Sequence, residues 1–120
     1  MRERQILGII AADLNCVLEA RRVCGLPGEA SPRVIARGAG WTVADVMCTF
    51  GPHDRRFEEM HSQAVIAVVA AGAFQYRSPS TGGNQLMTAG SLLLGNPGQS
   101  FECVHECGEG DRCLSFWFER

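Results

Sequence analysis

The chain has 120 residues, of which 46% are hydrophobic and 20% are charged, with a formal net charge of −2 at pH 7. These values are typical of one globular domain and argue against disorder. The small negative charge and the scattered arginines give no electrostatic sign of a nucleic-acid-binding surface. No apolar run reaches the ~18 residues of a membrane helix, and no secretory leader is recognisable, so we expect a cytoplasmic protein with reduced thiols.

Residues 4–24 are predicted to form a helix, because apolar side chains recur there at spacings of three and four. The sequence Gly25-Leu26-Pro27-Gly28 ends this helix. We therefore divide the chain into an N-terminal helix (1–24), a linker rich in Gly and Pro (25–40) and one domain (41–120). The apolar stripe of the helix is expected to pack on its own domain or on a second subunit.

From Trp41 onward, short apolar segments separated by glycine turns indicate antiparallel β structure. A turn at Ala71-Gly72 is expected to separate two of the strands. The expected fold class is mainly β, an antiparallel sandwich or small barrel that follows an N-terminal α-helix. The expected strands cover residues 43–50, 65–70, 74–77, 85–87, 92–94, 101–107 and 113–118.

Three cysteines and a histidine near the C-terminus form the most specific chemical pattern in the sequence. If residues 101–107 and 113–118 form a hairpin, Cys107 faces Cys113. Directly opposed Cβ atoms lie ~4.5–5.5 Å apart, which allows two thiolates to share one ion. The pattern therefore predicts a soft or borderline metal ion, with Zn²⁺ as the expected one. The predicted ligands are His105, Cys107 and Cys113, with Cys103 as a weaker fourth and His61, Cys48 or His53 able to complete the site.

Two other interpretations of these cysteines remain open. Free cysteine is a small hydrophobic residue that is often fully buried, so the group can simply belong to the core. Alternatively, Cys107 and Cys113 satisfy the distance requirement of a reversible disulfide, which would make the hairpin a redox sensor.

Three motifs resemble those of a known family. With the strand at 64–70 and the run at 86–94, they make residues 41–118 similar to the cupin-like N-terminal sensor domain of AraC-type bacterial transcription regulators. The resemblance implies a cupin-like antiparallel jelly-roll barrel. The motifs are Cys48-Thr49-x-Gly51-Pro52-His53-Asp54-Arg55, Phe57-Glu58-Glu59-x-His61-Ser62 and Gly110-Asp111-Arg112-Cys113-Leu114-Ser115-Phe116.

The chain departs from this family at two places. Metal-binding cupins carry a His-x-His pair in their first motif and a histidine in their second, whereas here His61 stands alone and Phe101 occupies the second slot. AraC-type regulators also continue into helix-turn-helix units, whereas this sequence stops at Arg120. We therefore expect no direct nucleic-acid binding by this segment.

The resemblance implies an effector-sensing domain rather than an enzyme. Such a domain binds a small molecule or a metal ion in or beside the barrel and passes that state to a partner surface. A homodimer through the N-terminal helix is one such arrangement. The alternative is a small metal-dependent cupin enzyme of the dioxygenase or isomerase type, which requires an open metal position with nitrogen or carboxylate ligands.

Overall fold

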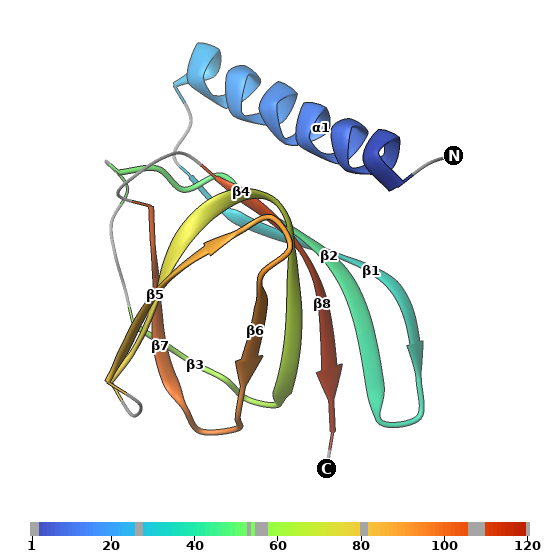
Figure 1. Ribbon diagram of the computed structural model, residues 1–120, viewed down its shortest axis with the longest axis vertical. Helices are drawn as coiled ribbons and strands as arrows, with labels where there is room; N and C mark the ends of the chain where they lie inside the picture. Colours follow the sequence, from blue (N-terminus) through green and yellow to red (C-terminus); the bar gives the residue numbers. More distant parts are fainter. Residues whose placement is uncertain are drawn as a thin grey trace.

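The computed structural model describes residues 3–25, 28–52, 54, 58–79, 82–105 and 110–119, with side chains from Asp13 onward. A curled antiparallel β structure follows one helix, which lies across one end of it (Figure 1). This is the mainly β fold with an N-terminal helix that the sequence predicted. The elements are α1 (Glu3–Cys24), β1 (Ala30–Gly38), β2 (Trp41–Cys48), β3 (Glu59–Met60), β4 (Ala64–Ser78), β5 (Gly83–Thr88), β6 (Leu92–Gly95), β7 (Ser100–Val104) and β8 (Asp111–Phe118).

β4 is the strand on which the sheet is assembled. Its first half pairs with β8 and β6, and its second half pairs with β5 and β7. A register irregularity between Val69 and Ala71 and a φ of 77° at Gly72 lie between the halves. The predicted turn at Ala71-Gly72 is therefore a bend inside one 15-residue strand. The bend lets a single strand serve both sides of a curled sheet.

The side chains of β4 alternate between the inside and the outside of the curl. Val65, Ala67 and Val69 are buried, whereas Ile66 is exposed and Val68 is partly exposed. This period-two pattern is what a strand with one solvated face requires. The buried core cluster consists of Val65, Ala67, Val69, Phe74, Tyr76, Met87, Leu93 and Cys113.

The segment 25–40, expected to be a linker, contains β1. This strand pairs with β2 along its whole length, from Ala30 opposite Cys48 to Gly38 opposite Trp41. Its residues are all exposed, and Pro32 is compatible with an edge strand. The linker expectation is therefore wrong over Ala30–Gly38, because pairing with β2 organises a segment whose composition alone suggested a loop.

β7 and β8 do not form the hairpin that the sequence suggested. β8 pairs with β2 on one side and β4 on the other, so both of its edges are occupied. β7 instead pairs with the second half of β4, where Cys103 lies opposite Tyr76. The hairpin expected from residues 101–107 and 113–118 is therefore wrong for the described residues of β7 and β8. Non-local pairing with β4 replaces the local hairpin.

α1 packs on its own domain, which is one of the two arrangements that the sequence analysis expected for its apolar stripe. Leu14 and Leu18 are buried against Ala71, with Met47 packed beside them. Asp13 of the helix also contacts Arg112 of β8, with 3.5 Å between the carboxylate and the guanidinium. Within the described residues, α1 lacks the long apolar stretch that would let it cross a membrane.

Candidate metal and ligand site

The curled sheet surrounds a cavity of about 570 Å³. This volume lies in the range of small-molecule sites, which combine apolar walls with a few polar groups. Aromatic and aliphatic side chains such as Phe74, Leu93 and Trp117 line it. The polar and sulfur-bearing side chains that also line it include Cys48, His61, Cys103, His105, Asp111 and Cys113.

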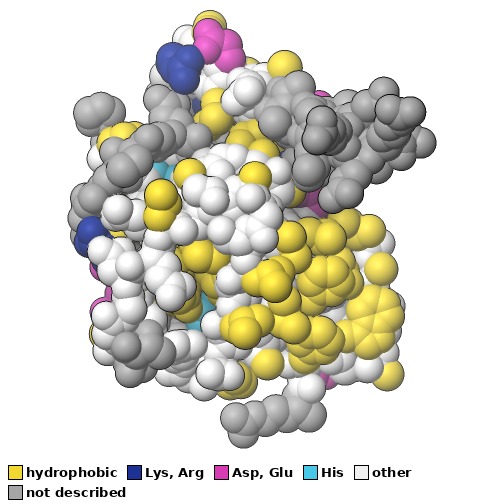
Figure 2. All heavy atoms as spheres, viewed as in Figure 1, with side chains coloured by type: hydrophobic (Ala, Val, Ile, Leu, Met, Phe, Trp, Pro, Cys, Tyr) yellow, Lys and Arg dark blue, Asp and Glu magenta, His cyan; other side chains and the backbone are white. Residues whose placement is uncertain are grey.

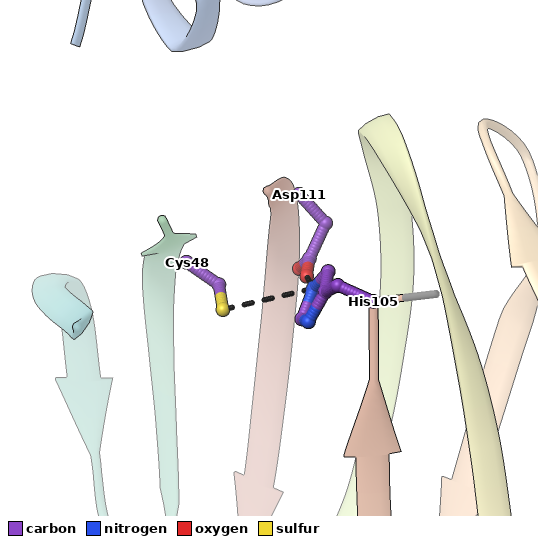
Figure 3. Close-up of side chains that lie close together, drawn as sticks. All are labelled: Cys48, His105 and Asp111. Carbon is purple, nitrogen blue, oxygen red and sulfur yellow. Dashed lines mark hydrogen bonds and ion pairs between the residues drawn. The ribbon is translucent and has the colours of Figure 1, made fainter. Parts of the chain in front are cut away.

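Cys48, His105 and Asp111 meet at one place in this cavity (Figure 3). All three are buried, and one ligand atom from each lies within 4.8 Å of the others. His105 Nε2 lies 2.8 Å from Asp111 Oδ2 and 3.8 Å from Cys48 Sγ. The group therefore joins the ends of three strands, because Cys48 ends β2, His105 follows β7 and Asp111 begins β8.

Strand register places two members of this group. Cys48 lies directly opposite Asp111 in the antiparallel pair of β2 and β8, so their side chains share one face. Cys113 is two residues further along β8 and shares that face by the period-two alternation of a strand. Its Sγ lies 3.3 Å from Asp111 Oδ1, where the thiol donates to the carboxylate. Cys113 is thus a neighbour of the group and a possible fourth ligand.

The thiols in the cavity are protonated at neutral pH in the absence of a metal. Burial raises the pKa of the Cys48 thiol to about 12, and the Asp111 carboxylate adds to this rise. Burial, followed by the same carboxylate, also raises the pKa of Cys103 and of Cys113. A nucleophilic cysteine needs a lowered pKa, so these groups are not activated for attack.

The geometry also differs from a Cys-His-Asp catalytic triad. In a triad the acid holds one ring nitrogen of the histidine and the nucleophile uses the other. Here both Cys48 Sγ and Asp111 Oδ2 approach the same atom, Nε2 of His105. Three donors converging on one point is instead the arrangement of a metal-binding group.

The three side chains fit a metal ion. They supply sulfur, nitrogen and oxygen donors, a set that suits zinc and related borderline ions. In a tetrahedral site with bonds of ~2.0–2.3 Å, neighbouring donor atoms lie about 3.3–3.7 Å apart. The sulfur-to-nitrogen distance of 3.8 Å is close to this value, and the nitrogen-to-oxygen distance of 2.8 Å is that of the hydrogen bond which a metal would replace. This buried group could therefore hold a metal.

His105 and Cys113, both predicted as ligands, each contact the Asp111 carboxylate, and of the two only His105 belongs to the close group. Cys103 lines the same cavity from β7, opposite Tyr76, and is not part of the close group. Cys107 lies outside the described residues, and so does His53. The fit of a complete His105, Cys107 and Cys113 set therefore stays a prediction.

His61 occupies a different part of the cavity wall. Its Nε2 lies 3.0 Å from the Tyr76 hydroxyl oxygen, and its ring stacks on Phe101 with 3.9 Å between centroids and 12° between planes. Burial lowers the pKa of His61, which favours the neutral imidazole. Phe101 thus occupies the second-motif position and contacts the lone first-motif histidine.

Asp111 is the member of the group that the sequence interpretation missed. Its neighbour Arg112 contacts Asp45, at 2.6 Å and 2.9 Å. The spacing of the two residues could have identified Asp111. Asp111 and Cys113 are two residues apart at the start of a strand, so their side chains point to the same side. Cys48, named only as a possible completing ligand, is brought in by the β2–β8 register.

Comparisons with known proteins agree with this architecture. No protein-family model matches the sequence, and the search of curated proteins finds no match. Among solved structures, a cupin-2 domain protein from Shewanella frigidimarina matches with a TM-score of 0.58 and 20% identity, over 74% of this chain and 80% of that one. A proposed mannose-6-phosphate isomerase from Ralstonia eutropha matches with a TM-score of 0.62 and 12% identity, over 77% and 86%.

The EutQ protein of Clostridium difficile is a third similar structure, with a TM-score of 0.63 and 9% identity, over 77% of this chain and 69% of that one. At these identities the similarity shows the fold alone. The chain therefore has a cupin fold, as the sequence resemblance implied.

Proposed function

We propose that this chain is an effector-sensing cupin domain of the AraC-type regulator kind, with a small molecule or a metal ion as its effector. The cavity beside buried Cys48, His105 and Asp111 supports binding of such an effector. Two of the motifs that carry the resemblance to these regulators, at 48–55 and 110–116, supply Cys48 and Asp111. We take the domain to be cytoplasmic and to act through a protein partner rather than on nucleic acid directly.

The observation that carries this proposal is the contact between α1 and the backbone at the site. Asp111 follows Gly110, whose N–H donates to the Phe50 carbonyl at 2.8 Å. A Cβ on Gly110 would lie 3.0 Å from Leu18 Cδ2, so the helix rests almost directly on this backbone. A change in the position of Asp111 when an effector binds would therefore be passed to Leu18 and to the helix.

Zn²⁺ is the ion we propose for the site. Cys48, His105 and Asp111 would hold it, and the buried thiol of Cys48 would bind as thiolate after releasing its proton. With Cys113 as a fourth protein ligand the site is closed, which is typical of structural or sensory zinc. The bound ion would supply a fixed positive charge that offsets the Asp111 carboxylate inside the cavity.

The first experiment measures zinc per chain by elemental mass spectrometry on protein purified under reducing conditions. Cys48→Ser and His105→Ala each remove one proposed ligand and should lower zinc affinity about tenfold or more. Cys16→Ser is the matched control, because Cys16 is an exposed free cysteine on α1. The metal assignment is wrong if Cys48→Ser and His105→Ala retain the zinc content of the parent.

The second experiment tests sensing separately from binding. Hydrogen exchange measured with and without zinc should change over residues 13–24 of α1, with β5 (Gly83–Thr88) as an internal control. Leu18→Ala should retain zinc and lose part of the change in the helix, because it removes the contact with Gly110. If zinc binds but leaves exchange in α1 unaltered, sensing through the helix is wrong even though the metal site stands.

A small metal-dependent cupin enzyme is the second candidate, and the position of the group beside the cavity favours it. Three protein ligands with a fourth position open toward a cavity is the catalytic arrangement. Cys113→Ser separates the two candidates. Loss of zinc in this variant supports a closed four-ligand site, whereas retained zinc supports a three-ligand site open to a substrate.

A further inference from the structure

The outer surface of the sheet carries a continuous apolar area, which we call the outer sheet face. It is formed by outward side chains of β6, β4, β8 and β2. Strand register places Leu94 opposite Ile66, Ile66 opposite Phe116, and Phe116 opposite Val43, so one apolar row crosses all four strands. The neighbouring positions extend this row along the strands with Leu92, Val68, Leu114, Ala64, Phe118 and Trp41.

Much of this face is open to solvent. Leu94 is 68% exposed and Leu92 is 62% exposed, while Ile66, Trp41 and Phe118 are each near 40%. Figure 2 shows hydrophobic side chains gathered over the region where β8, β2 and β1 lie in Figure 1. Five large apolar side chains exposed on one face are more than the single scattered apolar residues that are normal on a monomer, and contiguous exposed apolar patches are typical of interaction sites.

The chain already covers one end of this face with its own helix. Met47 projects from the same side of β2 as Val43 and packs with Leu14 and Leu18 of α1. Asp45 lies between Met47 and Val43, and its ion pair with Arg112 separates the helix-covered end from the open end. The open end is therefore a continuation of a surface that the fold already uses for packing.

The width of the open face indicates what would cover it. Four adjacent strands at a spacing of ~4.8 Å make a face about 19 Å wide. A helix with its side chains is ~10–12 Å across and would leave nearly half of this width in water. A second sheet of equal width covers it fully, because two sheets pack face to face about 10 Å apart with aligned strands.

Pairing of another strand with the edge of the sheet is less favourable than contact through the outer sheet face. β1 forms the edge beyond β2, and it carries Pro32, Arg33 and Arg37 together with a register irregularity between Val34 and Ala36. Proline, charged side chains and bulges at an edge oppose the addition of another strand. Contact through the face rather than the edge is therefore favoured.

We propose that the outer sheet face is the surface through which two copies of this chain form a symmetric dimer. A two-fold axis through the face brings the row of Leu94, Ile66 and Phe116 of one copy against the same row of the other, a self-complementary contact. This assigns dimerisation to the sheet and leaves α1 free to change with the state of the cavity.

Sedimentation equilibrium of the full chain at micromolar to about 100 μM concentrations tests the assignment. The parent should be a dimer, and Ile66→Lys should raise the dimer Kd at least tenfold, because it buries a charge at the centre of the contact. Leu86→Lys is the matched control. Leu86 is 57% exposed but lies on β5, away from the outer sheet face, so this variant should dimerise like the parent.

Two further variants keep the test decisive. Leu94→Lys replaces the most exposed residue of the row and decides the outcome if circular dichroism shows that Ile66→Lys is unfolded. Val17→Glu places a charge on the exposed side of α1 and should leave the dimer intact. A monomeric parent at about 100 μM, a parent-like dimer in the folded row variants, or dissociation by Val17→Glu alone would each overturn the proposal.

Discussion

His105 and Asp111 form a buried pair across the barrel, with 2.8 Å between Nε2 and Oδ2. One residue directly follows β7 and the other begins β8, so the pair joins two parts of the sheet that do not pair with each other in the described ladders. Their side chains are 2% and 8% exposed. Because loss of either partner leaves the other buried without this hydrogen bond, both residues support the fold as well as the proposed metal site.

Asp111→Ala should destabilise the metal-free protein by about 2–3 kcal/mol, because it leaves the buried His105 imidazole and Cys113 thiol without their acceptor. The measurement is chemical denaturation in the presence of a chelator. The double variant Asp111→Ala, His105→Leu should cost less than the sum of the single variants, since it removes both partners. Strict additivity would show that the pair makes no energetic contribution of its own.

Gly72 is expected to tolerate no side chain. Its φ is 77°, and a Cβ there would lie 2.3 Å from the Gly110 carbonyl oxygen, which is backbone and cannot move aside easily. Gly72→Ala should cost about 3 kcal/mol or more by thermal or chemical denaturation. Gly82→Ala is the control, because Gly82 has a similar φ of 65° and a Cβ placed there would meet no atom of the described residues within 4 Å, and it should cost about 1 kcal/mol.

Gly72 also lies opposite Asp111 in the register of β4 and β8. We therefore expect Gly72→Ala to weaken zinc binding along with stability, whereas Gly82→Ala should not. A destabilised Gly72→Ala protein with parent-like zinc affinity would show that the close approach of the two strands does not position Asp111.

Exposed cysteines should be alkylated faster than buried ones. Cys16 and Cys24 are exposed, whereas Cys48 is buried with a pKa raised to about 12. Because the thiolate is the reactive form, iodoacetamide at pH 8 should label Cys16 and Cys24 at least ~100-fold faster than Cys48. Peptide mass spectrometry over a time course gives the rates. Labelling of Cys48 at the rate of Cys16 in folded protein would contradict the burial and protonation described for the site.

The sequence predicted the elements of this fold better than their pairing. The helix and most strands follow from local periodicity, so residues 4–24 and the short apolar segments were recognisable. β1 was not, because its order comes from pairing with β2 and its residues carry no buried face. The bend at Gly72 was predicted as a turn, because glycine adopts a positive φ both in turns between strands and in bends within a strand. Only the strand pairing that continues past the glycine shows that this one is a bend.

In the candidate site too, local sequence predicted single residues but not the strand pairing that brings them together. His105 and Cys113 were identified from residue type and spacing, which are local properties. Cys48 and Asp111 join them through the β2–β8 register, which a hairpin interpretation of 101–118 could not contain. His61 was predicted as a residue able to complete the metal site. It lines the cavity, but its partners Tyr76 and Phe101 come from β4 and β7.

Stability in acid should depend on the ion pair between Asp45 and Arg112. Two hydrogen bonds join them, at 2.9 Å and 2.6 Å, and their side chains are 15% and 13% exposed. The hydrogen bond from Arg112 lowers the pKa of Asp45 below its ordinary value of 3.8. The folded state therefore binds this proton less readily than the unfolded state, so the stabilisation is fully present above about pH 4 and is lost as pH falls through the lowered pKa.

Asp45→Asn should accordingly reduce the free energy of unfolding by about 1–2 kcal/mol at pH 7, and the difference from the parent should shrink toward pH 2. Urea denaturation at a series of pH values gives both quantities. Asp13→Asn is the control, because Asp13 contacts the same guanidinium at 3.5 Å from a side chain that is 61% exposed, and it should change stability by less than ~0.5 kcal/mol. A difference between Asp45→Asn and the parent that stays constant from pH 7 to pH 2 would mean that Arg112 stabilises the ionised and the protonated carboxyl group of Asp45 equally, and would contradict the lowered pKa.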